Sequence, residues 1–205
     1  MPEIYYLGGS PCSGKSTIAE MLVEKYGFQY YKQDDHLEEY IKKGASEGYD
    51  LFKKVSLMTA EEMWMRDPVE QCNEEISLYE IMLLYAINDM SDLTKESPII
   101  AEGAGFLPHL IKKMSVEKSH YICIVPTKEF QVMKYSQRPW ISHYLSGCLD
   151  KDKAFQNWME RDALLAKIVL QEAENLGYEY LIVDGSQGID DNFAIIEKTF
   201  CLRVV

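Results

Sequence analysis

The sequence predicts an α/β protein in which a five-stranded parallel sheet is sandwiched by helices. Five short apolar runs have the length and composition of buried strands, at 3–8, 28–32, 98–101, 120–125 and 179–183. Helical patterns lie between them, and one is marked by an apolar face formed by Ile76, Tyr79, Leu83, Ala86, Ile87, Met90 and Leu93. Strands that alternate with helices favour a parallel sheet with helices on both faces.

The length of the chain, 205 residues, fits one domain with a full core. We find no repeat, low-complexity tract or linker that would mark a second domain. Two longer stretches interrupt the alternation of strands and helices, at about 36–96 and about 137–156. We expect a single domain over 1–205, with the first stretch as a helical insert that binds substrate. The second stretch is expected to be a mobile lid that excludes water.

Composition narrows the partners. The net charge is −12 and the sequence pI is about 4.8, which disfavours binding to nucleic-acid phosphates. The apolar runs are too short to cross a membrane, and the N-terminus lacks the pattern of an export signal. The five cysteines are scattered and lack the close pairs of a zinc site. We therefore expect a cytoplasmic monomer or homodimer that binds neither nucleic acid nor membrane.

The segment that follows the first strand carries the clearest motif. It contains the spacing Gly9-x-x-x-x-Gly14-Lys15-Ser16, the Walker A pattern of a phosphate-binding loop. Glycines let backbone N–H groups turn toward a phosphate, Lys15 reaches the outer phosphates, and the Ser16 hydroxyl ligates Mg²⁺. A helical pattern follows, so the phosphates would lie at a helix N-terminus. The expected nucleotide-binding residues of this loop are Gly9, Ser10, Pro11, Cys12, Ser13, Gly14, Lys15, Ser16 and Thr17.

Four segments together resemble the core of the nucleoside monophosphate kinase-like family of P-loop kinases. They are the loop, "YYKQDDH", "IIAEG" and "LIVDGSQGIDDNFAIIEKTF". The family includes adenylate, thymidylate, shikimate and gluconate kinases and the chloramphenicol phosphotransferases. The similarity covers the sheet and the loop and weakens over 42–96, where substrate is chosen. It implies ATP and Mg²⁺ as cofactors and a turn against the adenine formed by Gly185, Ser186 and Gln187.

Acidic residues end two of the expected strands. Asp34 and Asp35 follow the second strand and Glu102 ends the third, at the sheet edge where ligands of such folds collect. A kinase needs a carboxylate near the acceptor hydroxyl, and Mg²⁺ needs carboxylate or water ligands. The resemblance to shikimate kinases implies Asp34 or Asp35 as base and substrate anchor. We favour Asp34, also as a metal ligand with Ser16, and expect the other acid to cap the next helix.

The segment "AEGAG" places Glu102 before two glycines. Gly103 and Gly105 would let the backbone pass close to a ligand, and uridine kinase-like sequences carry a similar Glu-Gly pair. We therefore count Glu102 and Gly103 as substrate-binding candidates. The alternative is a solvated acid in a loop. His36 could touch substrate or serve a surface or capping role.

Arginine is scarce, with four residues against seventeen lysines. An arginine therefore indicates a place where a planar guanidinium group binds an anion. Arg161 falls on an apolar helical stripe, Arg138 begins the expected lid, and Arg66 lies in the insert. The resemblance implies that Arg138 stabilises the transferring phosphoryl group and that Arg66 holds substrate; we expect Arg161 to join Arg138. A structural ion pair is the alternative for each, and Arg203 is expected to be solvated.

The expected activity is transfer of the ATP γ-phosphoryl group to a small molecule, either a hydroxyl or a phosphate. An acceptor phosphate usually contacts several arginines, and the expected insert contains Arg66 alone. A neutral or weakly anionic hydroxyl compound is therefore favoured as the acceptor. Met63, Trp64 and Met65 are either a pocket for an apolar substrate body or part of the core. The alternatives are a nucleotide-binding regulatory protein and an ATPase without an acceptor. "TKEF" has Phe130 where a GTPase requires Asp.

Overall fold

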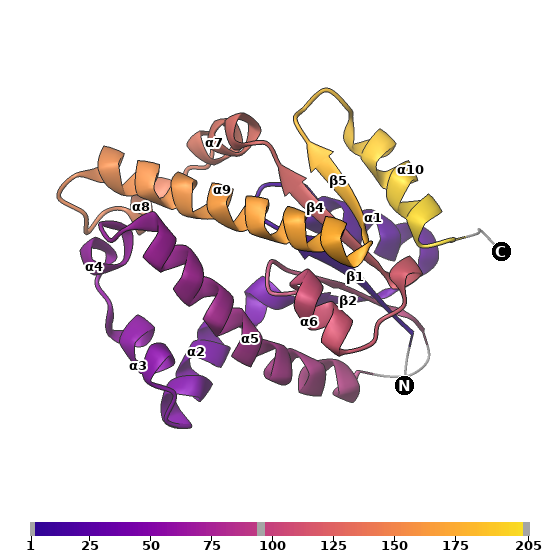
Figure 1. Cartoon of the computed structure of the whole chain (residues 1–205), viewed down its shortest axis with the longest axis horizontal. Helices are drawn as coiled ribbons and strands as arrows, with labels where there is room; N and C mark the ends of the chain where they lie inside the picture. The colour runs from indigo at the N-terminus through magenta and orange to yellow at the C-terminus, as the bar shows by residue number, and fades with distance from the viewer. Residues whose placement is uncertain (1–2, 94–96, 203–205) are drawn as a thin grey trace.

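The computed structural model describes residues 3–93 and 97–202. Within them lies one five-stranded sheet with the strand order β2-β3-β1-β4-β5, and every neighbouring pair is parallel (Figure 1). The strands are β1 (Ile4–Gly9), β2 (Gln29–Lys32), β3 (Ile99–Glu102), β4 (Tyr121–Pro126) and β5 (Glu179–Val183). The predicted fold class is confirmed, and each predicted strand lies within one residue of the observed one.

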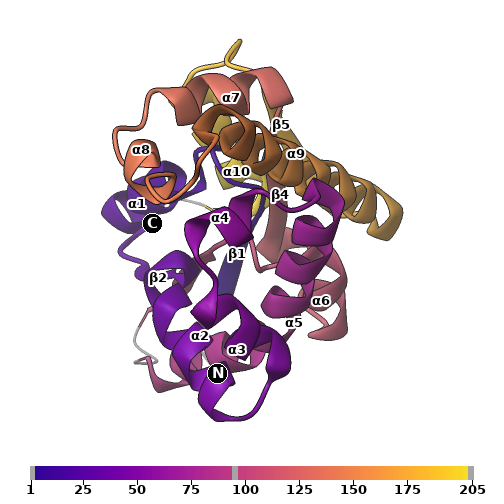
Figure 2. The same ribbon diagram turned by 90° about the vertical axis from the view of Figure 1, so that its left-hand side faces the viewer.

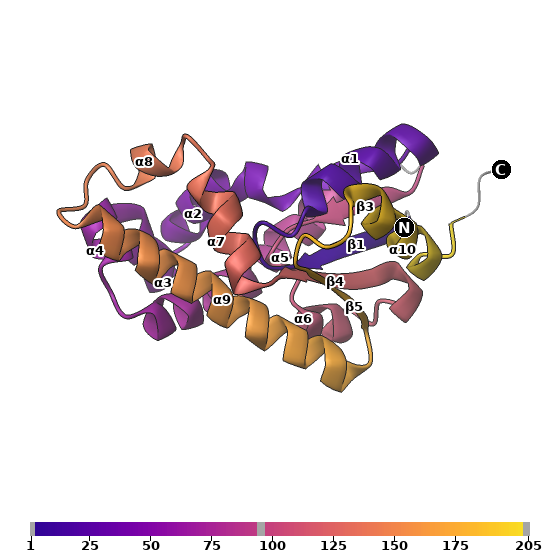
Figure 3. The same ribbon diagram turned by 90° about the horizontal axis from the view of Figure 1, so that it is seen from above.

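Helices cover both faces of the sheet, as the alternation of strands and helices predicted. One face carries α1 (Lys15–Tyr26) and α10 (Ile189–Thr199), and the other carries α5 (Pro68–Asp92), α6 (Pro108–Lys113) and α9 (Lys151–Leu176) (Figure 3). Successive side chains of β1 alternate between these layers. Tyr5 and Leu7 pack in the core on the α1 side, and Tyr6 packs in the core on the α9 side.

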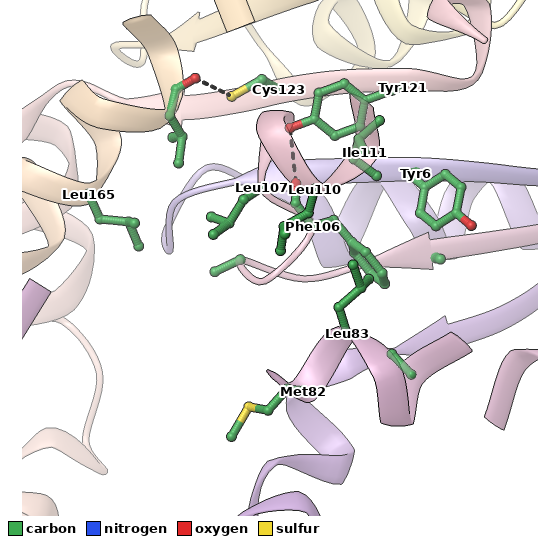
Figure 4. Close-up of a cluster of buried hydrophobic side chains, with 14 of the residues drawn as sticks. Tyr6, Met82, Leu83, Phe106, Leu107, Leu110, Ile111, Tyr121, Cys123 and Leu165 are labelled. Carbon is green, nitrogen blue, oxygen red and sulfur yellow. Dashed lines mark hydrogen bonds between the residues drawn. The ribbon is translucent and has the colours of Figure 1, made fainter. Parts of the chain in front are cut away.

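The core on the α9 side joins strands, α5 and α6 (Figure 4). Tyr121 of β4 is fully buried, and its hydroxyl donates a hydrogen bond of 3.0 Å to the carbonyl oxygen of Phe106. Met82 and Leu83 bring α5 into the same cluster. Each large apolar side chain that is fully buried contributes about 1.5–3 kcal/mol, so this cluster anchors the insert to the sheet. One residue of the apolar face predicted for α5 is not buried: Ile87 is 38% exposed.

The insert consists of four helices after a 3₁₀ turn, η1 (Gln33–His36). They are α2 (Leu37–Ser46), α3 (Asp50–Leu57), α4 (Ala60–Trp64) and α5. Local signals fix where two of them begin: Thr59 and Glu62 form a capping box on α4, and the Asp67 carboxylate accepts hydrogen bonds from two N–H groups at the start of α5. The last residues of the expected insert, 94–96, lie outside the described part of the chain.

The expected lid follows α7 (Lys128–Ser136) and contains one short helix, α8 (Ile141–Tyr144), before the first residues of α9. Its buried residues pack against α4 and α9: Ile141, Leu145 and Cys148 belong to the same cluster as Trp64 and Trp158. The lid and the helices α2–α4 therefore lie at the same end of the molecule (Figures 1 and 2). A second 3₁₀ turn, η2 (Lys118–His120), leads into β4. No helix over 3–93 or 97–202 combines the length and apolar character needed to span a bilayer.

Candidate active site

The phosphate-binding loop connects β1 to α1, and its glycines are required by its backbone. Gly9 has a φ of 113°, and a Cβ there would lie 1.9 Å from the carbonyl oxygen of Ile124. Gly14 has a φ of 86° directly before the first residue of α1. Both are conformations that only glycine adopts at little cost. Because Gly14 has no side chain to cap the helix, the N-terminal N–H groups of α1 remain available to an anion.

Lys15 is buried, and among the described residues its ammonium donates hydrogen bonds to neutral oxygens. Its Nζ donates to the carbonyl oxygen of Ser10 at 2.6 Å and to the Ser13 hydroxyl at 3.2 Å. A buried ammonium is stabilised more strongly by an anion than by neutral acceptors. The loop therefore presents both a positive helix end and an ammonium group to a bound phosphate.

A cavity of about 440 Å³ lies on one side of the loop. It is closed by α7 and by the turn after β5, and it is lined by Cys12, Ser13, Gly14, Thr17, Phe130, Lys134, Arg138, Val183, Gly185, Gln187, Ile189 and Asn192. Gly185 has a φ of 88°, and a Cβ there would lie 2.9 Å from the ring of Phe130. We call this the nucleotide cavity. The expected turn thus contributes Gly185 and Gln187 to it, whereas Ser186 donates its hydroxyl to Asp184 at 2.6 Å.

A second cavity, of about 420 Å³, lies on the other side of the loop. Its lining combines the loop with side chains of the insert, the sheet edge and the lid: Pro11, Cys12, Ser13, Gly14, Lys15, Ser16, Thr17, Asp34, Leu37, Tyr79, Glu102, Ala104, Tyr135, Arg138, Trp140, Tyr144 and Trp158. We call this the acceptor cavity. Both cavities share the loop and Arg138, so a group held by the loop faces both.

The two acids after β2 differ in their surroundings. Both are exposed, but Asp34 lines the acceptor cavity and Asp35 does not. The Asp35 carboxylate lies 3.6 Å from Lys32 Nζ. Neither caps α2, because both lie in η1 and the capping position of α2 is His36, which makes no side-chain capping hydrogen bond. The expectation that one of the two acids caps the next helix is therefore wrong.

Glu102 is the most buried acid of the site. It is 1% exposed and accepts hydrogen bonds from the Ser16 hydroxyl at 2.8 Å and from the Tyr30 hydroxyl at 3.1 Å. Burial raises the pKa of Glu102 above its ordinary value, and the nearby charge of Lys15 opposes that rise. The alternative of a solvated loop acid is wrong, since Glu102 is the last residue of β3 and is paired in register with Leu7 of β1.

The residues around Ser16 fit a magnesium ion. The Ser16 hydroxyl, the Glu102 carboxylate and the Asp34 carboxylate line the same cavity, and oxygen donors of this kind are those that Mg²⁺ prefers. No group of three or more His, Cys, Asp or Glu residues able to hold a metal ion occurs in the described part of the chain. A site of one or two carboxylates, completed by water and by phosphate oxygens, matches the usual magnesium site of phosphoryl-transfer enzymes.

The glycines after Glu102 make room for a protein side chain. Gln33 is buried and accepts a hydrogen bond of 2.9 Å from the Gly105 N–H. A Cβ on Gly103 would lie 2.5 Å from the Gln33 side-chain oxygen. Gly103 is not among the residues that line either cavity. The two small residues are thus explained by Gln33, and binding of substrate by Gly103 stays a prediction.

Arg138 is the arginine that the structure brings to both cavities. Its guanidinium carbon lies 5.0 Å from the centre of the Tyr135 ring and 5.5 Å from that of Trp140. These distances are in the range of cation–π contacts. The lid therefore presents a positive charge, held by two aromatic rings, at the boundary between the two cavities.

Arg161 and Arg66 are neutralised by carboxylates. The Arg161 side chain is 14% exposed, with its Nη2 2.6 Å from an Asp162 oxygen and its Nε 3.2 Å from a Glu75 oxygen. Arg66 pairs with Glu74 and Glu70 of α5. Neither arginine lines either cavity. A role for Arg161 at the phosphoryl group and for Arg66 at substrate would require them to leave these pairs, and both stay predictions; Arg203 lies outside the described residues.

The aromatic side of the acceptor cavity was missed by the sequence analysis. Trp64 belongs to a buried cluster, where it stacks on Trp158 with ring centres 4.2 Å apart, so the core interpretation of this residue is correct. The rings that line the cavity come from other segments: Tyr79 of α5, and Tyr135, Trp140, Tyr144 and Trp158 of the lid and its flanking helices. The motif "RPWISHY" gives one usable signal: two aromatic residues that closely follow an arginine in the expected lid.

The phosphate-binding loop between β1 and α1 and the parallel strand order form a P-loop fold like that of solved kinase structures. Solved structures with this fold include shikimate kinase from Acinetobacter baumannii in complex with shikimate, with 16% identity over 98% of this chain and 94% of that one and a TM-score of 0.50. A protein from Thermus thermophilus has 14% identity over 98% of each chain and a TM-score of 0.51. No family model and no curated protein sequence matches the chain.

Proposed function

We propose that this chain is an ATP-dependent phosphotransferase that moves the γ-phosphoryl group of ATP to a hydroxyl or phosphate group of a small molecule. The observation that carries the proposal is the arrangement of the two cavities. They meet at the phosphate-binding loop and share Arg138, and carboxylates line only the acceptor cavity among the described residues. A donor and an acceptor need this arrangement if a phosphoryl group is to pass between them.

Each residue of the site has a role in this proposal. The N-terminus of α1 and Lys15 bind the β- and γ-phosphates and stabilise charge that develops on them. Asp34 orients the acceptor hydroxyl and accepts its proton while the acceptor oxygen bonds to the γ-phosphorus and the bond to ADP breaks. Arg138 stabilises the transferring group. Ser16, with Asp34 and Glu102, would hold Mg²⁺, which neutralises charge on the phosphate oxygens.

The nucleotide cavity supports ATP over GTP. Phe130 occupies the position where a guanine-specific motif carries Asp, and its ring packs on Gly185. This turn gives a base a flat wall and backbone groups. We propose that adenine binds here, that helices α2–α5 select the acceptor, and that the segment from about 137 to 156 acts as the lid of a single-domain enzyme.

The proposal is tested by a screen of metabolites and nucleosides for acceptors. ATP consumption would be followed with Mg²⁺ and each compound, and the phosphorylated product would be identified by mass spectrometry. We expect slow hydrolysis without an acceptor and strong stimulation by one class of compound, lost in Lys15→Ala. If ATP binds and no compound stimulates its consumption, the chain is a nucleotide-binding regulatory protein or an ATPase, and the proposal is wrong.

A further inference from the structure

We propose that the acceptor is an uncharged hydroxyl compound that carries a flat, unsaturated ring. The inference rests on the proposed kinase function and specifies its acceptor. It follows from two features of the acceptor cavity: its apolar, largely aromatic wall and the state of the neighbouring charges.

The aromatic wall consists of Tyr135, Trp140, Tyr144 and Trp158, which all line the acceptor cavity. The rings contact one another, with centres 5.3 Å apart for Tyr135 and Trp158 and 5.4 Å apart for Trp140 and Tyr144. Trp140 is 41% exposed and Tyr144 is 56% exposed. Their free surface is of the kind that a flat ring covers well, since offset or edge-to-face contacts add about 0.5–1.5 kcal/mol to the gain from burial.

The insert adds apolar surface to the same cavity. Leu37, in the first turn of α2, lines the cavity and is 41% exposed. Exposed large apolar side chains thus reach the cavity from both the insert and the lid. A sugar or polyol without a flat ring would leave the apolar surface of the cavity exposed to water. A ring-bearing acceptor would remove it from water, at about 25 cal/mol for each Å² covered.

Charge argues against an anionic acceptor. The cations that line the acceptor cavity are Lys15 and Arg138, and both are engaged by the transferring phosphoryl group in the proposed mechanism. The arginines of the neighbouring helices, Arg66 and Arg161, are paired with carboxylates. A phosphate or carboxylate on the acceptor would instead meet Asp34 and Glu102, and an unpaired like charge lowers affinity strongly.

A cationic acceptor is disfavoured by Arg138. Its guanidinium already lies over the rings of Tyr135 and Trp140, the faces that an ammonium group would seek. A second cation there would be repelled by the first. The acceptor that suits the aromatic wall is therefore uncharged.

The test measures acceptor binding apart from phosphoryl transfer. The nucleotide cavity is filled with Mg²⁺ and a non-hydrolysable ATP analogue, and uridine, adenosine, uridine monophosphate, adenosine monophosphate and ribitol are titrated by calorimetry. The chain's three tryptophans, Trp64, Trp140 and Trp158, all lie in or against the aromatic wall, so intrinsic fluorescence gives a second signal. We expect at least one nucleoside to bind, and to bind at least tenfold more tightly than its monophosphate, with ribitol weaker still.

Two tyrosine variants make the comparison specific. Tyr144→Leu is expected to weaken nucleoside binding about tenfold with the ATP analogue unaffected. Tyr180→Leu is the matched control, because Tyr180 is 41% exposed on β5 and does not line the cavity. The inference is overturned if neither nucleoside binds, if a monophosphate or ribitol binds as tightly as the best nucleoside, or if Tyr144→Leu has no effect. Nucleoside binding without any phosphoryl transfer would instead uphold this inference and refute the kinase function.

Discussion

The Ser16 hydroxyl at the start of α1 donates a hydrogen bond of 2.8 Å to Glu102 Oε1 at the end of β3. This contact joins the residue expected to hold Mg²⁺ to the most buried acid of the site. Glu102 also accepts from Tyr30, so two neutral donors stabilise a carboxylate that has little access to water. The charge state of Glu102 is therefore sensitive to pH and to what binds beside it.

Glu102→Gln should stabilise the fold at neutral pH. Because burial raises the folded-state pKa of Glu102 above the ordinary value of 4.5, wild-type stability falls relative to the variant as pH rises through that raised pKa. Below 4.5 the acid is neutral in both states and the difference should vanish. Urea unfolding of both proteins at pH 4 and pH 7 measures this. An advantage of the variant that grows toward low pH would contradict the assignment.

Lys15→Ala should abolish phosphoryl transfer and leave the fold intact. Its ammonium contacts loop oxygens and not the core, so its loss removes several kcal/mol of transition-state stabilisation with little effect on packing. Steady-state turnover and thermal unfolding are the measurements. Lys167→Ala, on an exposed position of α9, serves as the control. Near-full turnover in Lys15→Ala would show that the loop is not the active site.

Asp34→Asn should lower turnover about 100-fold or more with ATP affinity little changed, the size expected of a positioned acid–base group. Asp35→Asn is a matched control from the next residue: it is exposed, beside Lys32, and absent from the lining of the cavity. Its turnover should stay close to wild type. If the two variants exchange these behaviours, Asp35 is the working acid; if both are silent, the acceptor binds elsewhere.

Arg161→Ala should lower the stability of the fold, whereas Arg138→Ala should weaken binding of the transferring phosphoryl group. Arg161→Ala leaves Glu75 and Asp162 buried without their cation, so it should lower the free energy of unfolding by about 3–5 kcal/mol. Arg138→Ala should leave stability unchanged and should weaken binding of a planar transition-state mimic such as ADP with aluminium fluoride. Turnover should fall in both. An Arg138→Ala enzyme that binds the mimic as well as wild type would remove Arg138 from the phosphoryl group.

ATP should bind better than GTP by about tenfold, which corresponds to 1.4 kcal/mol. The reason is that the turn after β5 and Phe130 offer backbone groups and a flat ring, and Phe130 stands where guanine specificity requires Asp. Calorimetric titration of both nucleotides with Mg²⁺ measures the difference. Equal or reversed affinities would count against adenine binding at this turn.

The sequence was most informative where one local pattern determines one local structure. Apolar runs located the strands, and the spacing of Gly9 and Gly14 located the loop, because each depends on neighbouring residues alone. It was least informative where two distant segments meet. The room that Gly103 leaves for Gln33, and the pairing of Glu75 with Arg161, follow from how strands and helices pack. No periodicity within either segment encodes those contacts.

The lid is fastened to the insert at several points. The Leu149 N–H donates to a Glu61 carboxylate oxygen at 2.9 Å, and Ile141, Leu145 and Cys148 of the lid share a buried cluster with Trp64 of α4. Opening the lid must therefore disrupt packing in the insert as well, which makes the two segments one cooperative unit of local unfolding. Amide protons of both segments should then report a common free energy of opening in hydrogen exchange, and a bound acceptor should raise it in each. Residence of the acceptor and of the nucleotide would be governed by the same opening event.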